Sequence, residues 1–102
     1  MGSFSFLYTT SKKLNEFWQR DSMILDVRSK SEFQNGAISG SHNIPLNELR
    51  ERISEIKNWN RPVITCCVIG VKSEKAASIL KKQGIESING GGWVSLSKKL
   101  KK

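Results

Sequence analysis

Two continuous apolar runs constrain the fold of this chain more than any other feature. They are PVITCC, residues 62–67, and MILDV, residues 23–27, in which Asp26 is the one charged residue. Runs of this kind are typical of parallel strands that are covered on both faces. Helical patterns precede and follow them. The alternation favours an α/β fold, a small and mostly parallel sheet with helices on both faces.

The remainder of the chain supplies helices and shorter extended pieces. Ser11 and Asn47 are candidate N-caps, and Gly84 is a candidate helix end. The expected elements, in chain order, are a helix from Ser11, a strand at 23–27, a helical turn at 30–36, an extended piece at 41–45, a helix at 46–56, a strand at 62–67, a helix at 73–84, a strand at 85–89, and a terminal helix after a glycine turn at 90–92.

Length and charge limit the kinds of protein that this chain can be. Its 102 residues have room for one domain, with a core at about 10–96 and a basic C-terminal tail at 97–102 that we expect to be solvated and frayed. Of 17 basic and 9 acidic side chains, the excess of +8 lies entirely after residue 56. A one-sided basic field attracts small anions or acidic protein surfaces. Because no RNA-binding aromatic motif accompanies the lysines, we expect no nucleic-acid partner.

The N-terminal sequence and the cysteines bear on location. MGSFSFLYTT has no charged segment, and its apolar run is too short for a signal peptide or a membrane span. A disulfide between the neighbours Cys66 and Cys67 would close a strained ring, so we expect two reduced thiols. We therefore expect a cytoplasmic monomer with no membrane partner. The sequence has no metal-ligand spacing, and we expect no metal.

The stretch CCVIGVKS, residues 66–73, can be interpreted in two registers. From Cys66 it is C-x5-K-S, close to the C-x5-R-S of a thiol phosphatase, and from Cys67 it is the shorter C-x2-G-x-K-S. In either case a tight turn from strand to helix directs backbone N–H groups inward, and Gly70 permits the conformation that this requires. The start of the helix adds free N–H groups and a positive dipole end. Such donors lower the pKa of a thiol and make it a nucleophile.

Four segments resemble the rhodanese-like domains, a family of single-domain sulfurtransferases. They are ILDVRSKSEF, GAISGSHNIPL, CVIGVKS and NGGGW, in the family's order and spacing over about residues 10–96. The resemblance implies that Cys67 carries a persulfide. It also implies that the following residues form the loop around that sulfur, namely Val68, Ile69, Gly70, Val71, Lys72 and Ser73. Related phosphatases have a loop one residue longer with an arginine clamp, and Lys72 cannot provide that bidentate fork. The shorter register is therefore favoured.

The sequence departs from the family's pattern near the site. Active members often have charged or hydroxyl residues in the loop, whereas Val68, Ile69 and Val71 are apolar. A histidine common in the family is replaced by Ala37, and Leu96 occupies the usual tryptophan position while Trp93 directly follows the glycines. We place Arg28 and Trp93 as possible rim residues. On a strand, Cys66 should point to the face opposite Cys67 and serve as a core residue.

The resemblance implies an enzyme that moves a sulfane sulfur through a Cys67 persulfide by double displacement, with no cofactor. Its donor would be a small sulfur-containing anion such as thiosulfate, or a persulfide. Its acceptor would be cyanide or a thiol, including a thiol on a protein. The alternative is a persulfide carrier or protein-binding module with little thiosulfate turnover. A thiol phosphatase is the third interpretation.

Overall fold

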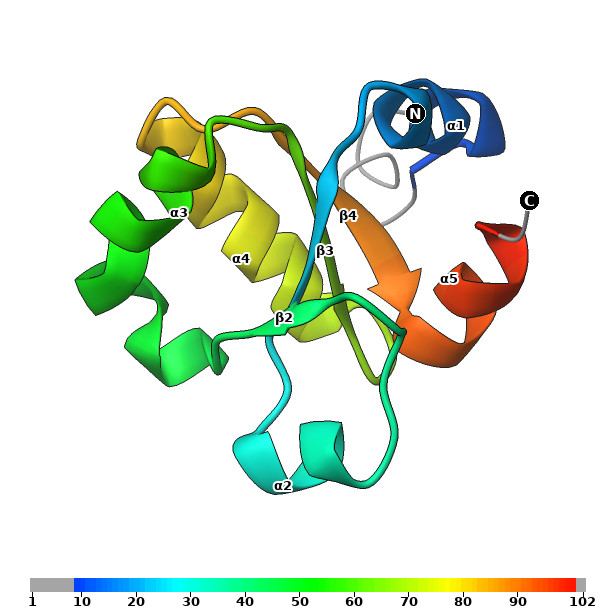
Figure 1. Cartoon of the computed structure of the whole chain (residues 1–102), viewed down its shortest axis with the longest axis horizontal. Coiled ribbons are helices and arrows are strands. Elements are labelled where there is room, and N and C mark those ends of the chain that lie inside the picture. Colours follow the sequence, from blue (N-terminus) through cyan, green and yellow to red (C-terminus); the bar gives the residue numbers. More distant parts are fainter. Residues whose placement is uncertain (1–8, 101–102) are drawn as a thin grey trace.

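A computed structural model describes residues 9–100, in which short strands alternate with helices (Figure 1). Met1–Tyr8, Lys101 and Lys102 lie outside the described residues, and so do the expectations that fall on them. The elements, in chain order, are α1 (Ser11–Gln19), β1 (Met23–Asp26), α2 (Lys30–Gln34), β2 (His42–Asn43), the 3-10 helix η2 (Leu46–Arg52), α3 (Ile53–Trp59), β3 (Val63–Cys67), α4 (Val71–Lys82), β4 (Ser87–Gly92) and α5 (Trp93–Lys99).

The four strands form one sheet in the order β2-β1-β3-β4, and every neighbouring pair is parallel. The apolar runs predicted as doubly covered strands are the two central ones. All five residues of β3 are buried, and three of the four in β1 are. The predicted parallel α/β fold is confirmed.

Each face of the sheet packs against its own helices. On one face, Leu25, Val63 and Cys67 belong to a cluster with side chains of η2, α3 and α4. On the other face, Ile24, Ile64 and Cys66 belong to a cluster with side chains of α1 and α5. Figure 1 shows α3 and α4 on one side of the strands and α1 and α5 on the other. Neighbouring residues of one strand therefore enter different clusters, as the strand periodicity of two requires.

Both predicted N-caps were wrong by one or two positions. Thr10 rather than Ser11 caps α1, with its side-chain oxygen accepting a hydrogen bond from the Lys13 amide at 3.2 Å. Asn47 lies inside η2, which begins after Pro45 without a side-chain cap. The expected helix at 46–56 is a 3-10 helix followed by an α-helix. A positional shift of this size is common because several polar residues near a helix start can serve as the cap.

The C-terminal part also differs from the prediction. The strand β4 continues through the three glycines that were expected to form a turn. Helix α5 then extends into the predicted tail, and Leu100 is buried in the cluster beside α1. Lys98 and Lys99 are exposed, as expected of solvated lysines. The tail prediction was therefore wrong for residues 97–100, because an apolar side chain among the lysines anchors this segment to the core. Among residues 9–100, no helix is both long and apolar enough to span a bilayer.

Candidate active site

Cys67 is the last residue of β3, at the carboxyl end of the sheet. The chain leaves β1 toward β2 on one side, and β3 lies on the other side of β1, so the strand order changes direction between β1 and β3. Crevices at such a switch point are where parallel α/β sheets bind ligands. Figure 1 shows the β3–α4 loop at this end of the sheet, which is also the end where α2 lies.

Three short contacts surround the Cys67 sulfur. The backbone amide of Gly70 donates to Sγ at 3.0 Å, the amide of Ser73 donates at 3.3 Å, and the Ser73 hydroxyl lies 3.2 Å away. Gly70 has φ +96°, a conformation that favours glycine. Helix α4 begins at Val71, two residues earlier than predicted, so the Ser73 amide is one of its free N-terminal donors.

These donors change the acidity of Cys67. Burial opposes ionisation of the thiol. Hydrogen bonds from the Ser73 hydroxyl and from the amides of Ser73, Gly70 and Ile69 outweigh that effect and lower the Cys67 pKa below its ordinary value. The loop thus favours the thiolate more than the surroundings of an ordinary cysteine do, and the thiolate is the nucleophilic form.

Cys66 has the opposite environment. It is fully buried in the cluster with α1 and α5, and burial is the main cause that raises the pKa of its thiol. Its prediction as a core residue on the other face is confirmed. The longer phosphatase-like register needs Cys66 in the loop, and its side chain lies on the wrong face for that.

Arg28 is held in place by a buried ion pair. Its guanidinium donates to both carboxylate oxygens of Asp26, with the shortest contact at 2.8 Å, and to the Gly36 carbonyl at 2.7 Å. The Trp93 ring centroid lies 4.4 Å from the guanidinium carbon, within the range of a cation–π contact. Arg28 and Asp26 are 5% and 0% exposed, so this is a desolvated pair.

A hollow of about 380 Å³ lies above Cys67, and it is lined by Arg28, Glu32, Cys67, Val68, Ile69, Val71 and Lys72. Of the two predicted rim residues, Arg28 lines it. Trp93 does not line it, and its ring contacts the Arg28 guanidinium. Lys72 is the second cation that lines the hollow. The three apolar loop side chains are exposed, with Ile69 at 78%.

Comparison with known proteins identifies the family. The profile of the Rhodanese-like domain matches residues 9–99. The chain belongs to the rhodanese-like domain family. The putative sulfur carrier protein YrkF of Bacillus subtilis is 40% identical over 65 residues, which cover 64% of this chain and 35% of that protein. The thiosulfate sulfurtransferase GlpE of Shewanella oneidensis is 31% identical over 91 residues, which cover 85% of this chain and 89% of GlpE.

A solved structure agrees with the family assignment. The reduced CoADR-RHD protein of Bacillus anthracis is similar at a TM-score of 0.73 and 29% identity, over 94% of this chain and 17% of that one. This rhodanese-like domain thus corresponds to a small part of that larger protein and to about a third of YrkF, but to most of GlpE.

The glycines before Trp93 bring β4 against the cysteine loop. A Cβ at Gly92 would lie 2.6 Å from the Val68 carbonyl oxygen, and one at Gly90 would lie 2.7 Å from the Ile64 side chain. Pairing shifts by one residue in this stretch, since Thr65 is opposite Asn89 and Cys67 is opposite Gly92. This β-bulge, a feature common beside active sites, accommodates the loop.

Asn89 is the site residue that sequence reasoning missed. It is 4% exposed on β4, and its carboxamide contacts both Ser73 and Gly70. The available signal was a polar residue at the predicted carboxyl end of a strand, where parallel sheets gather their functional side chains.

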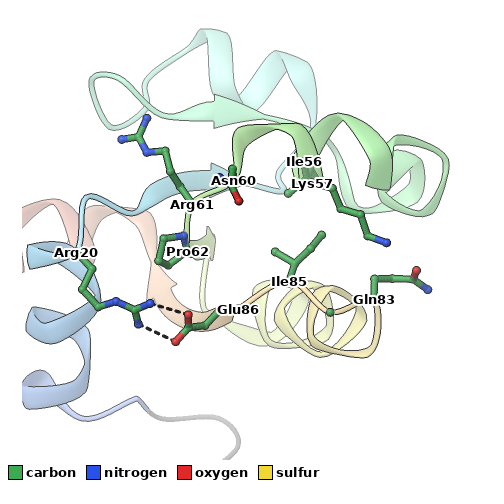
Figure 2. Close-up of a pocket in the computed structure, with 10 residues that line it drawn as sticks. Arg20, Ile56, Lys57, Asn60, Arg61, Pro62, Gln83, Ile85 and Glu86 are labelled. Atoms are coloured by element: carbon green, nitrogen blue, oxygen red, sulfur yellow. Dashed lines mark hydrogen bonds and ion pairs between the residues drawn. The ribbon is translucent and has the colours of Figure 1, made fainter.

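Other candidates carry no comparable chemistry. His42 is exposed and stacks on Trp59 at a ring separation of 4.7 Å, a surface position. The hollow in Figure 2, about 440 Å³, lies at the opposite, amino-terminal end of β3 and β4, and one wall holds the exposed Arg20–Glu86 ion pair. Within residues 9–100, no cluster of three or more His, Cys, Asp or Glu could hold a metal ion.

Proposed function

We propose that this rhodanese-like domain is a sulfurtransferase with Cys67 as its nucleophile. The observation that carries the proposal is the set of N–H donors on a buried sulfur at the floor of an open hollow, with Gly70 and Ser73 at 3.0 and 3.3 Å. A thiolate needs such donors to ionise near neutral pH, and a persulfide anion needs them to carry its charge. The similarity to GlpE, which is named a thiosulfate sulfurtransferase, supports the same reaction.

The proposed reaction has two displacements. The Cys67 thiolate attacks the outer sulfur of thiosulfate, a new S–S bond forms, and the old S–S bond breaks as sulfite leaves with the bonding electrons. The product is a Cys67 persulfide anion in the loop from Val68 to Ser73. A thiolate acceptor then attacks the terminal sulfur and leaves with it as a persulfide, which restores the Cys67 thiolate. No net charge is gained or lost in either step.

Arg28 and Lys72 would attract the anionic donor. Both line the hollow above Cys67, and Arg28 is fixed there by Asp26, the Gly36 carbonyl and Trp93. We propose that Trp93 acts by supporting Arg28. The reaction requires Cys67 as a free thiol, and both cysteines are free, so we propose a reducing compartment such as the cytoplasm.

A second function, a persulfide carrier that docks on a protein, is favoured by the exposed apolar loop. Val68, Ile69 and Val71 are 56%, 78% and 57% exposed around the sulfur. A small anion gains little from such a rim, whereas an apolar protein surface would bury it. The similarity to YrkF, named a putative sulfur carrier protein, agrees with this function.

Intact-mass analysis tests the shared step. The protein is incubated with thiosulfate, with cysteine persulfide, or with a cysteine desulfurase and cysteine, and peptides are then mapped. We expect one added sulfur atom on Cys67, none in Cys67→Ser, and normal loading in Cys66→Ala. Added sulfur on Cys66, or no loading by any donor, would contradict the proposal. Multiple turnovers with thiosulfate would favour the enzyme, and loading only by the protein donor would favour the carrier.

A further inference from the structure

A buried chain of three side chains runs from the reactive sulfur to β4. The Ser73 hydroxyl lies 3.2 Å from Cys67 Sγ and donates to Asn89 Oδ1 at 2.7 Å. Asn89 is itself fixed on both sides, because Nδ2 donates to the Gly70 carbonyl at 2.9 Å and Oδ1 accepts from the Gly91 amide at 2.9 Å. Cys67, Ser73 and Asn89 are at most 4% exposed. The orientation of this carboxamide is therefore determined.

The Ser73 hydroxyl can donate only one hydrogen bond at a time, to Asn89 or to Cys67. A serine hydroxyl has one proton and two acceptor lone pairs. While Ser73 donates to Asn89, its oxygen can only accept, and the Cys67 S–H is the donor that faces it. When Cys67 is a thiolate, the hydroxyl proton has to turn from Oδ1 to the sulfur. Asn89 Oδ1 still accepts from the Gly91 amide in that state, so no buried oxygen is left without a partner.

We propose that Asn89 is a positioning residue that acts on Cys67 through Ser73. It accepts the hydrogen bond of the Ser73 hydroxyl whenever the Cys67 sulfur carries no charge. The proposal rests on the proposed role of Cys67 as nucleophile. When Cys67 of the free domain is ionised, the hydroxyl donates to the thiolate. Once a sulfane sulfur is attached, the negative charge lies on the terminal sulfur beside the loop, and the hydroxyl turns back to Asn89. By accepting this hydrogen bond, Asn89 stabilises the thiol and the persulfide of Cys67 relative to its thiolate.

Other charged groups also face Cys67. Arg28 from the β1 side, Glu32 from α2 and Lys72 from α4 line the hollow above it, and Asp26 pairs with Arg28. The backbone donors Gly70 and Ser73 contact its sulfur directly. Removal of Asn89 takes away the acceptor of the Ser73 hydroxyl, which lowers the Cys67 pKa. It also removes the anchor on the Gly70 carbonyl, which loosens a donor to the sulfur and raises that pKa, so a single variant would mix the two effects. A double-mutant cycle with Ser73 separates them.

The test measures the pH midpoint of Cys67 alkylation in the full chain, in a Cys66→Ala background, for wild type, Asn89→Ala, Ser73→Ala and the double variant. Asn89→Ala shifts the midpoint once with Ser73 present and once in the Ser73→Ala background. We expect the shift with Ser73 present to lie about one pH unit further toward low pH, since a hydrogen bond to a charged group is worth roughly that much. Equal shifts in the two backgrounds, or coupling of the opposite sign, would overturn the proposal.

Two further measurements complete the experiment. Asn43→Ala is the matched control, because Asn43 Nδ2 also donates to two backbone carbonyls, those of Asp26 and Arg28, at the end of β2. We expect it to leave the midpoint within about 0.3 pH units of wild type, a few tenths of a kcal/mol. Asn89→Ala should also lose a preloaded sulfur to a thiol acceptor several-fold faster. A wild-type midpoint at or above that of an ordinary thiol would instead contradict the proposed function.

Discussion

At the scale of the residue, two adjacent cysteines have opposite chemistry because a strand directs neighbouring side chains to opposite faces. Cys67 meets amide donors and a hollow, and its pKa is lowered. Cys66 meets the apolar cluster of α1 and α5, and its pKa is raised. One residue along the chain thus separates a candidate nucleophile from a core thiol.

The first prediction concerns the pH dependence of the two thiols. In native protein Cys67 should be alkylated with a midpoint below the ordinary thiol pKa of about 8.5, and Cys66 should stay unmodified. Because the folded pKa of Cys67 is the lower one, its ionisation stabilises the fold fully above the unfolded pKa, and this contribution is lost as pH falls through the folded pKa. Mass spectrometry of quenched samples across pH checks this. Alkylation of Cys66 at native pH would be inconsistent with its burial.

A second prediction concerns the buried pair Asp26–Arg28. In Arg28→Met the Asp26 carboxylate stays buried with no guanidinium, so we expect a loss of about 3–5 kcal/mol in the free energy of unfolding. The double variant Asp26→Leu/Arg28→Met removes both charges and should recover part of that loss. Urea denaturation monitored by tryptophan fluorescence measures both. A single variant as stable as wild type would show that the Asp26 carboxylate does not depend on Arg28 in the folded state.

At the scale of the element, β4 shows how a strand can be shaped by its neighbour. Gly90 lies against the side chains of Ile64 and Leu96, and Gly92 lies against the Val68 carbonyl, whereas a Cβ at Gly91 would meet nothing within 4 Å. A bulge then aligns Gly92 with Cys67. The glycine-rich stretch looks like a turn in sequence, yet it is part of a strand in which Gly90 and Gly92 leave room for β3, α5 and the cysteine loop.

A third prediction separates crowding from backbone conformation. In Gly90→Ala the new Cβ would meet Ile64, Leu96 and the Thr65 carbonyl within 2.8 Å, so we expect a loss of about 1–3 kcal/mol in stability. Gly84→Ala is the control, because a Cβ there meets nothing within 4 Å and only the positive φ of +80° is unfavourable. That variant should lose about 1 kcal/mol. Denaturant midpoints measure both, and an unchanged midpoint in Gly90→Ala would mean that β4 moves away freely.

At the scale of the whole molecule, basic side chains gather near the carboxyl end of the sheet. A second hollow of about 410 Å³ adjoins the first, since Lys72 lines both, and Arg50 and Lys75 complete its cationic lining. The excess positive charge lies after residue 56 in sequence, yet Arg50 joins it in space. This field should attract an anionic donor or an acidic partner toward the site.

The fourth prediction tests that field. With an acidic protein donor, the association rate should fall steeply as salt rises, and Arg50→Glu/Lys75→Glu should slow it by about tenfold or more at low salt. Cys67 alkylation by a neutral reagent should change less than twofold, because neither residue contacts the sulfur. Stopped-flow measurements across ionic strength check both. A rate that is flat with salt would leave the lysines as a solubility feature.

The sequence by itself determined the parallel α/β fold, the two central strands and the face of each cysteine. These follow from local patterns, apolar runs and a period of two, which depend on residues close together in the chain. The consecutive strand, glycine and helix start also indicated a loop of N–H donors beside the two cysteines, while the choice of Cys67 came from the resemblance to the rhodanese-like family. Helix caps were predicted less well, since several nearby polar residues compete for one position.

Only the tertiary structure decided the contacts between distant residues. Asn89 reaches Ser73 across 16 positions, the Trp93 ring contacts Arg28, and Leu100 is buried at a lysine-rich end that was predicted to fray. None of these has a local pattern, because each depends on how β1, β4 and α5 pack around β3. The donors that lower the Cys67 pKa are local, in the loop up to Ser73, whereas the packing around β3 buries the sulfur and places Asn89 against Ser73.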